Sequence, residues 1–175
     1  MSQLIPAWVN GELVNRDKLE VHKLGLKHPA ISVFLIANGK TLLQRRAMIK
    51  YHTPGLWANT VCTHPHPGED MKACATRRLG EELGIGGVKL ESQHHLEYRA
   101  DVGNGLIEHE VVEIFVAHVP EGLSISPNPE EVMASRWISF EQLKEEVAAT
   151  PTEFTPWLQI YVSDHLTKII DPVHA

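Results

Sequence analysis

Residues 59–84 read NTVCTHPHPGEDMKACATRRLGEELG, and this stretch decides most of the fold. Its second half predicts a helix over residues 69–83, because acidic residues occupy the first turn, apolar residues recur every fourth position and Gly84 ends the pattern. Its first half places the thiol of Cys62 two residues before the imidazole of His64. A thiol, an imidazole and a carboxylate-rich helix this close together suggest a metal-assisted active site.

Three Asn-Gly pairs, each next to an apolar run, predict β-hairpins. They are Asn10-Gly11, Asn38-Gly39 and Asn104-Gly105. A two-residue type I′ turn needs positive φ at both central positions, which Asn and Gly adopt at low cost. We therefore expect a sheet that is largely antiparallel.

Two further helices are predicted near the end of the chain. Ser139 and Gln142 form a capping box for a helix that runs to about Ala149. Thr155 as cap and Pro156 at the first helical position start another, whose apolar face is Leu158, Tyr161, Val162, Leu166 and Ile169. Strands, one helix, more strands and then two helices predict an α+β fold with helices packed on the sheet.

Length and composition limit the class of protein. A chain of 175 residues without a linker or repeat predicts one domain over residues 1–175, with an N-terminal extension (1–28) and a core (29–175). Its 16 basic and 22 acidic residues give a net charge of −6, so no global basic field favours nucleic acid. Two cysteines are too few for a disulfide scaffold, and no apolar run approaches the length of a membrane span. We expect a soluble, cytoplasmic monomer with no membrane partner.

The strand predicted over residues 106–118 carries two carboxylates on its apolar face. A period of two places Glu108 and Glu110 on the same side as Val112, Ile114 and Val116. Burying two carboxylates together is costly without a counter-charge, and a bound cation is one solution. The alternative is a bulge that turns both glutamates toward solvent.

Histidines supply candidate ligands for such a cation. His22 and His28 precede the predicted strand 31–37, and His64 follows Cys62. Three imidazoles and two carboxylates suit Mn²⁺, Zn²⁺ or Mg²⁺, and the sequence does not rank these metals. The sequence has 11 histidines, so an isolated one is usually not a ligand. We interpret His52, His66, His94, His95, His118, His165 and His174 as surface or packing residues.

Local basic residues are candidates for binding an anion. They are Arg45, Arg46 and Lys50 after the strand at 41–44, and Arg77 and Arg78 on the helix. Arg78 lies one turn before Glu82, so the guanidinium is able to grip a phosphate while Glu82 binds its metal ion. The alternatives are an ordinary i,i+4 ion pair for Arg78 and Glu82, and a solvated hairpin end for the arginines at 45 and 46.

The segment from Pro65 to Ile85 resembles the Nudix box, which consists of a glycine, five residues, a glutamate, seven residues, and a run of Arg-Glu-apolar-any-Glu-Glu-any-Gly-apolar. Two positions depart from that pattern: Thr63 stands in place of the glycine, and Arg78 in place of a metal-binding glutamate. The resemblance implies a Nudix-like fold. The arginine argues against ordinary Nudix hydrolysis.

A closer resemblance is to the type I isopentenyl-diphosphate isomerase family, and it extends from about Lys18 to Trp157. The matching segments are PGLWANTVCTHP at 54–65, EHE at 108–110, EEV at 130–132 and FTPW at 154–157. The resemblance implies an enzyme of isoprenoid biosynthesis that interconverts isopentenyl and dimethylallyl diphosphate. A small isoprenyl diphosphate is then the expected partner.

The resemblance also implies roles for individual residues. Cys62 and Glu110 become the acid/base pair, and the order in which they move protons stays open. A divalent metal is bound by His22, His28, His64, Glu108 and Glu110. A second ion, Mg²⁺, bridges Glu82 and the carbonyl of Cys62 to the diphosphate, whose oxygens meet Lys18, Arg46, Lys50 and Arg78. Tyr98 and Trp157 close over the isoprenyl group, where an aromatic face stabilises a carbocation; the alternative for Trp157 is a plain core residue.

Two other functions compete with the isomerase. The first is a Nudix diphosphate hydrolase, which releases phosphate and does not need Cys62. The second is a non-catalytic Nudix module that binds a metabolite or a partner protein without turnover.

Overall fold

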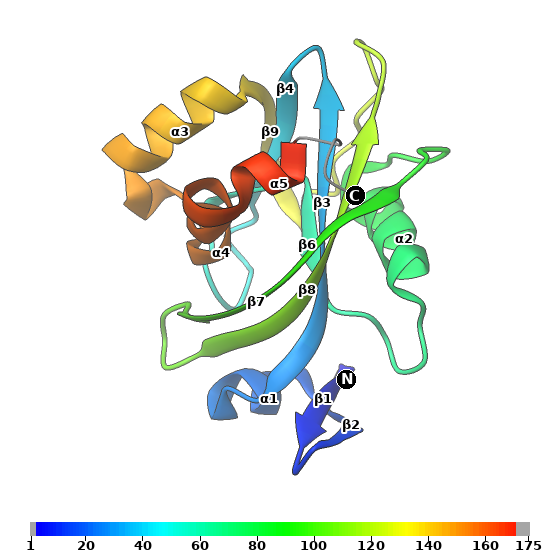
Figure 1. Ribbon diagram of the computed structural model, residues 1–175, viewed down its shortest axis with the longest axis vertical. Helices are drawn as coiled ribbons and strands as arrows, with labels where there is room; N and C mark the ends of the chain where they lie inside the picture. Colours follow the sequence, from blue (N-terminus) through cyan, green and yellow to red (C-terminus); the bar gives the residue numbers. More distant parts are fainter. Residues whose placement is uncertain (1–2, 171–175) are drawn as a thin grey trace.

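A mixed sheet lies between two layers of helices in this computed structural model, which describes residues 3–170 (Figure 1). The strands are β1 (Leu4–Val9), β2 (Glu12–Asp17), β3 (Lys27–Ala37), β4 (Lys40–Arg46), β5 (Trp57–Ala58), β6 (Val61–Thr63), β7 (Glu91–Asp101), β8 (Ile107–His118) and β9 (Val132–Ser139). The helices are α1 (Lys18–Leu24), α2 (Met71–Leu83), α3 (Phe140–Ala149), α4 (Pro156–Ile160) and α5 (Leu166–Ile170). A 3₁₀ turn (Pro151–Glu153) precedes α4, and a π-helical turn (Tyr161–His165) joins α4 to α5. The predicted α+β class is confirmed. His174, which we interpret from the sequence as a surface or packing residue, lies outside the described residues.

The main sheet has the strand order β5-β4-β3-β8-β7, with β6 also pairing with β3 and β9 with β4. Strands β3 and β8 are parallel, and the other strand-to-strand pairings of this sheet within residues 3–170 are antiparallel. An isolated parallel bridge joins Trp57 of β5 to Phe154. The prediction of a largely antiparallel sheet is therefore confirmed. Because β6 and β8 pair with opposite edges of β3, their side chains approach that strand from two directions.

All three Asn-Gly pairs lie in hairpins with positive φ. Asn10-Gly11 joins β1 to β2, with φ of 52° and 85°, and Asn38-Gly39 joins β3 to β4, with φ of 48° and 71°. The hairpin between β7 and β8 is longer, because the backbone N–H of Val102 donates to the carbonyl of Leu106 around Asn104-Gly105. The hairpin predictions are confirmed.

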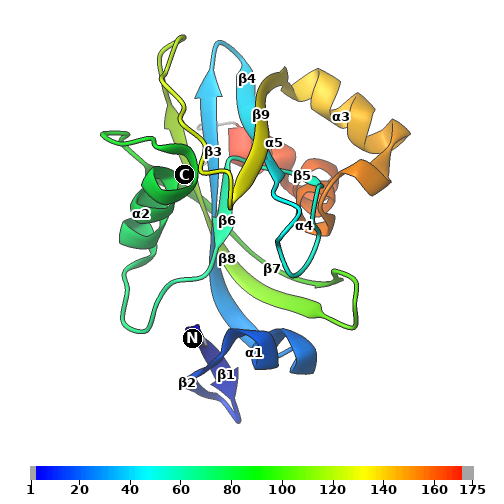
Figure 2. The same cartoon turned by 180° about the vertical axis from the view of Figure 1, so that it is seen from behind.

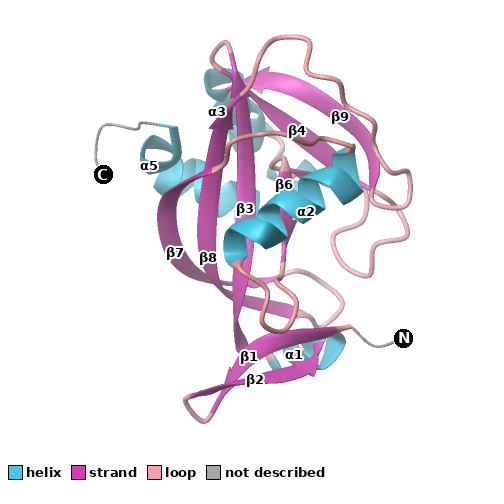
Figure 3. Cartoon of the chain, turned by 90° about the vertical axis from the view of Figure 1, so that its right-hand side faces the viewer, coloured by secondary structure: helices cyan, strands magenta, loops and turns pink. Residues whose placement is uncertain are grey.

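Helices cover both faces of the sheet, as Figure 2 and Figure 3 show from other sides. On one face, Leu79 and Leu83 of α2 lie in a core with Phe115 of β8. On the other face, Phe34 of β3 lies in a core with Trp157 of α4. Alternate side chains of β3 and β8 therefore pack into two cores on opposite faces of the sheet. The candidate site lies at one end of the core that contains Phe34 and Trp157.

The sequence predicts the end of α2 correctly and places its start two residues too early. Gly84 ends the helix with φ of 66°, in the left-handed conformation that glycine adopts without cost. The helix begins at Met71, and Asp70 is its N-cap, with the carboxylate accepting from the backbone N–H of Ala73 at 3.0 Å. Asp70 thus stabilises the helix from outside rather than from the first turn.

The other two predicted helices form with simpler caps. The hydroxyl of Ser139 accepts from the backbone N–H of Gln142 at 3.1 Å, but the Gln142 side chain donates to Glu146, so half of the capping box is present. Thr155 is the N-cap residue of α4 without a side-chain cap bond, and Pro156 is its first residue. Within residues 3–170 no helix is long and apolar enough to cross a membrane.

Candidate active site

Two carboxyl groups of β8 point to the covered face of the sheet. Glu108 and Glu110 are 2% and 1% exposed, so the prediction that they face inward is confirmed and the solvent-facing alternative is wrong. Tyr98 of β7 lies opposite Glu110, and its hydroxyl is 2.8 Å from Oε2 of each carboxyl group. One hydroxyl has one proton to donate, so this pair of acids needs a further proton or a cation.

The two carboxyl groups differ in proton affinity. Burial and the charge of Glu110 raise the pKa of Glu108. Burial acts in the same direction on Glu110, but contacts with His28 and His64 outweigh it and hold the pKa of Glu110 well below its usual range. One Tyr98 hydroxyl contacts both carboxyl groups, so the two acids lie close enough for the charge of one to affect the proton affinity of the other.

Three imidazoles reach Glu110 from separate elements. His22 lies on α1, His28 on β3, and His64 directly after β6. Ligand atoms of these histidines and of Glu110 all lie within 4.8 Å of one another. His64 Nε2 is 2.9 Å from Glu110 Oε1 and 3.1 Å from His28 Nε2. The structure therefore brings the predicted ligands together, with Glu108 beside them.

Backbone carbonyls fix the proton positions of two of these rings. Nδ1 of His22 lies 2.6 Å from the carbonyl of Lys18, and Nδ1 of His28 lies 2.7 Å from that of Leu26. A carbonyl only accepts, so each Nδ1 donates and each neutral ring keeps its lone pair on Nε2. This arrangement is typical of histidines that bind a metal through Nε2.

Buried nitrogen atoms without partners show that the cluster fits a cation. Within the described residues, Nε2 of His22 and Nδ1 of His64 have no hydrogen-bond partner. Burial lowers the pKa of His22 to about 4 and that of His64 well below its usual value, so both rings are neutral near pH 7. Neutral imidazoles beside two carboxyl groups form a donor set for a divalent metal ion.

His52 is a member of the cluster that the sequence reasoning missed. It is buried, as a packing residue is, but its Nε2 lies 3.5 Å from Glu108 Oε1, and it forms a second group of ligand atoms with His22 and Glu108. Its position two residues after Lys50 is the signal that pointed there. We call His22, His28, His52, His64, Glu108 and Glu110 the histidine–carboxylate floor.

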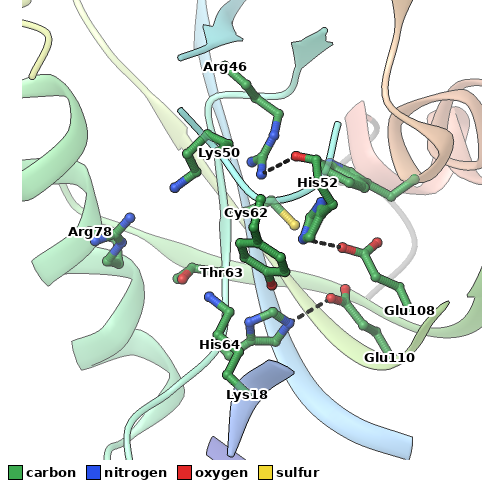
Figure 4. Close-up of a pocket in the computed structure, with 12 residues that line it drawn as sticks. Lys18, Arg46, Lys50, His52, Cys62, Thr63, His64, Arg78, Glu108 and Glu110 are labelled. Carbon is green, nitrogen blue, oxygen red and sulfur yellow. Dashed lines mark hydrogen bonds and ion pairs between the residues drawn. The ribbon is translucent and has the colours of Figure 1, made fainter. Parts of the chain in front are cut away.

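Four cations line the pocket above this floor. Lys18, Arg46, Lys50 and Arg78, which we call the basic rim, line one pocket with Cys62, His64, Glu108, Glu110 and Trp157 (Figure 4). They come from α1, β4, the following loop and α2, so the fold gathers residues that are 60 positions apart in sequence. All four residues predicted to meet phosphate therefore lie at one pocket.

Glutamates partly neutralise the basic rim. Arg78 pairs with Glu82 at 2.5 Å and with Glu131 at 3.3 Å, and Lys50 also pairs with Glu131. The i,i+4 ion pair between Arg78 and Glu82 is therefore present, as the alternative interpretation predicted, and Arg78 lines the pocket as well. Gln44 donates to the other oxygen of Glu82 at 2.7 Å, which holds this buried carboxylate in place.

The protonated form of Lys18 is destabilised by burial and by the other cations of the basic rim. Burial, together with the charges of Lys50, Arg78 and Arg46, lowers the pKa of Lys18 to about 8. Its Nζ lies 5.6 Å from the centre of the Tyr51 ring, a second pocket residue that the sequence reasoning missed. Cations held this close together favour an anion between them.

Cys62 and Glu110 face the same pocket from opposite edges of β3. Cys62 lies on β6 opposite Ser32, and Glu110 lies on β8 opposite His28. Burial and the charges of Glu110 and Glu108 raise the pKa of the Cys62 thiol, so it carries its proton near pH 7. Two groups able to exchange protons thus lie on two sides of one enclosed space.

Trp157 is both a core residue and a wall of the pocket. It is 1% exposed, belongs to the core on that face of the sheet, and donates from Nε1 to Asn59 Oδ1 at 3.2 Å. The Arg46 guanidinium carbon lies 5.3 Å from the centre of its ring. Among the predicted site residues, Tyr98, His22, His28 and Glu82 do not line this pocket but contact residues that do.

The chain is similar to known proteins in both sequence and fold. A model of the NUDIX domain matches residues 26–158. A crystal structure of DR0079 from Deinococcus radiodurans has a TM-score of 0.71 at 16% identity, covering 91% of this chain and 96% of that one. A dihydroneopterin triphosphate pyrophosphohydrolase of E. coli has a TM-score of 0.56 at 17% identity, covering 77% and 91%. The chain belongs to the NUDIX domain proteins.

Sequence relatives identify the branch. The isopentenyl-diphosphate Delta-isomerase of Rhodobacter capsulatus is 57% identical over 173 residues, which is 99% of this chain and 98% of that protein. The isopentenyl-diphosphate Delta-isomerase of Roseobacter denitrificans is 56% identical over 169 residues, which is 97% and 96%. Within the NUDIX class, the chain belongs to the isopentenyl-diphosphate Delta-isomerase family.

Proposed function

We propose that the protein interconverts isopentenyl diphosphate and dimethylallyl diphosphate, as a cytoplasmic enzyme of isoprenoid biosynthesis. The observation that carries this proposal is the placement of Cys62 and Glu110 on two sides of one pocket, below four cations. A diphosphate bound at the basic rim puts its hydrocarbon end between the thiol and the carboxyl group. The extension at 1–28 takes part, because it carries Lys18, His22 and His28.

The reaction moves one double bond and exchanges one proton with the site. A proton added to the terminal methylene carbon leaves a tertiary carbocation, and loss of a proton from the carbon next to the oxygen-bearing one forms the new double bond. Cys62 and Glu110 share these two transfers, one as acid and the other as base. Tyr98 positions the carboxyl group of Glu110 through its 2.8 Å hydrogen bond.

The pocket walls protect the carbocation from water. Trp157 presents an aromatic ring that excludes solvent, and a desolvated cation over such a face gains about 2 kcal/mol. Arg46 already lies against this ring, which supports the ring's capacity to bind positive charge.

Two divalent ions are part of this proposal. His22, His28, His64, Glu108 and Glu110 bind one, Mn²⁺, Zn²⁺ or Mg²⁺, whose charge offsets that of the buried carboxylates. Glu82 and the Cys62 carbonyl would hold a second ion, Mg²⁺, which would neutralise charge on the diphosphate. Lys18, Arg46, Lys50 and Arg78 bind the phosphate oxygens, because guanidinium and ammonium groups pair strongly with phosphate.

Product analysis tests the proposal. The purified protein, loaded with divalent metal, is incubated with isopentenyl diphosphate and Mg²⁺, and the products are separated by chromatography. The dimethylallyl isomer is the expected product. Inorganic phosphate or pyrophosphate as product would indicate a hydrolase instead, and unchanged substrate that nevertheless binds would indicate a non-catalytic module.

A further inference from the structure

His52 occupies a built position in the histidine–carboxylate floor. Its carbonyl accepts from Arg46 Nη2 at 3.2 Å (Figure 4). Its Nδ1 lies 3.1 Å from Thr53 Oγ1. Thr53 has φ of 47°, a left-handed conformation that is strained for a β-branched residue. The ring of His52 also meets the ring of Trp157 edge-on, with centres 6.0 Å apart. Several contacts therefore hold this imidazole in one orientation.

The free nitrogen of His52 faces an oxygen without bonding to it. Nε2 of His52 and Oε1 of Glu108 are 3.5 Å apart, longer than a normal N–H···O hydrogen bond. Thr53 Oγ1 can accept from Nδ1 or donate to it. In the tautomer that carries its proton on Nδ1, Nε2 has a lone pair, and two acceptors then point toward one another. Such a pair is unfavourable unless a cation lies between them.

Three pairs of floor atoms are spaced as neighbouring ligands of an ion are. Neighbouring ligands about 2.1 Å from an ion in octahedral geometry are about 3.0 Å apart, and opposite ones about 4.2 Å. His52 and Glu108 are separated by 3.5 Å, His64 and Glu110 by 2.9 Å, and His28 and Glu110 by 3.6 Å. His22 belongs to both groups of ligand atoms, and its buried Nε2 has no partner within residues 3–170.

We propose that Nε2 of His52 is a sixth protein ligand of the divalent ion bound at the floor. This inference rests on the metal site of the proposed function, to which it adds one donor. Ligand atoms of His22, His28, His64 and Glu110 form one group, and those of His22, His52 and Glu108 form a second, so the two groups share His22. An ion that draws both groups together then has four imidazole nitrogens and two carboxylate oxygens as ligands.

A closed shell of six donors has two chemical consequences. It suits a six-coordinate ion such as Mn²⁺ better than Zn²⁺, whose protein sites are usually tetrahedral. It also leaves no position for water or for a phosphate oxygen. The floor ion therefore acts through its charge and by holding the strands together, while the diphosphate needs its own Mg²⁺.

Counting the water molecules bound to Mn²⁺ tests this shell. The full-length protein, freed of metal, receives half an equivalent of Mn²⁺ without any diphosphate, and electron–nuclear double resonance is recorded in ¹⁷O-enriched water. The wild type is expected to show no coupling from a coordinated oxygen of water. His52→Ala is expected to gain one such coupling and to bind Mn²⁺ at least about 10-fold more weakly.

Three further variants make the result decisive. His28→Ala removes a ligand already assigned to the floor and is expected to gain the same coupling, whereas His95→Ala alters an exposed histidine and is expected to gain none. His52→Gln keeps a polar side chain in the buried position and guards against misfolding of the alanine variant, which circular dichroism checks. It is expected to lose the nitrogen coupling of the fourth imidazole.

The outcomes separate this inference from the proposed function. Coordinated water in the wild type, or an unchanged spectrum and affinity in both His52 variants, would overturn the sixth ligand and leave the isomerase intact. A protein that binds no Mn²⁺ at the floor would overturn the metal site as a whole. Isomerisation of isopentenyl diphosphate is measured separately and decides the proposed function.

Discussion

The histidine–carboxylate floor and the basic rim of the pocket are arranged for ions of opposite charge. The histidine–carboxylate floor is buried, and backbone carbonyls fix the tautomers of His22 and His28. The basic rim keeps its charges, and Glu82 and Glu131 pair with them. The floor is thus arranged for a cation that stays, and the rim for an anion that arrives and displaces glutamate contacts. Cys62 lies between the two.

The largest expected effect is at this junction. Cys62→Ala or Glu110→Gln should lower the rate of isomerisation by about 10³-fold or more, because each removes a proton-transfer group. Cys74→Ala is the matched control, since this buried cysteine lies on α2 in the other core. Turnover is measured on protein whose circular dichroism is unchanged. Full activity in the Cys62 variant would remove the thiol from the reaction.

The second prediction concerns loading of the floor with metal. A ligand at 100 times its dissociation constant stabilises the folded state by about 2.7 kcal/mol. For a chain of this size we expect Mn²⁺ to raise the melting temperature by about 5–10 °C, and chelation to reverse the shift.

Variants of the two regions should respond differently to that test. His28→Ala should abolish the thermal shift, while Lys50→Ala on the rim should keep it. Thermal unfolding followed by circular dichroism gives both values. Equal shifts in the two variants would mean that the metal does not bind at the floor.

The third prediction separates two adjacent arginines of α2. Arg78 lines the pocket, whereas Arg77 binds Glu69 at 2.6 Å and Glu81 at 3.0 Å. Arg78→Ala should raise KM for isopentenyl diphosphate by about 10- to 100-fold, the value of a charge-assisted contact to phosphate. Arg77→Ala should leave KM within about threefold and lower stability instead. Steady-state kinetics at two ionic strengths would refute the assignment if both variants changed KM equally.

The smallest effect is expected outside the pocket, at Glu69. The Arg77 guanidinium, with the backbone N–H of His66, lowers the pKa of Glu69 from 4.5 to about 2. The folded state therefore loses its proton more readily than the unfolded state, and the pair contributes stability above pH 4.5 that is lost as the pH falls toward 2.

Urea unfolding of Glu69→Gln measures this contribution. Solvent screening limits the pair to about 1 kcal/mol at pH 7. The difference between variant and wild type should narrow at pH 3.5, where the unfolded chain already protonates Glu69. A difference that stayed the same at both pH values would argue against the ion pair as its source.

Much of the fold follows from local signals in the sequence. Three features depend only on residues that are neighbours in sequence, so the sequence predicts them directly. They are the Asn-Gly turns, the end of α2 at Gly84 and the alternation of buried side chains around Glu110. The start of α2 was predicted two residues early, because Asp70 at the cap and an acidic residue in the first turn look alike in sequence. The parallel pairing of β3 with β8 has no local signal, since it joins segments about 80 positions apart.

The site is harder to predict from sequence, because a histidine that binds a metal and a histidine that only packs in the core have the same sequence pattern. The sequence groups His22, His28 and His64 with Glu110, and in the structure their ligand atoms lie within 4.8 Å of one another. His52 is interpreted as a packing residue because its position two residues after Lys50 indicates the pocket but does not mark a metal ligand. Its place depends on the strained backbone at Thr53 and on how a loop folds over Trp157, which sequence spacing does not encode.

Proton transfer between solvent and substrate tests the central claim most directly. The protein with Mg²⁺ and isopentenyl diphosphate in ²H₂O is followed by ¹H, ²H and ³¹P NMR. We predict dimethylallyl diphosphate with solvent deuterium in a methyl group and both phosphorus signals of the diphosphate intact. Release of inorganic phosphate, or a substrate that binds and acquires no deuterium, would contradict the account.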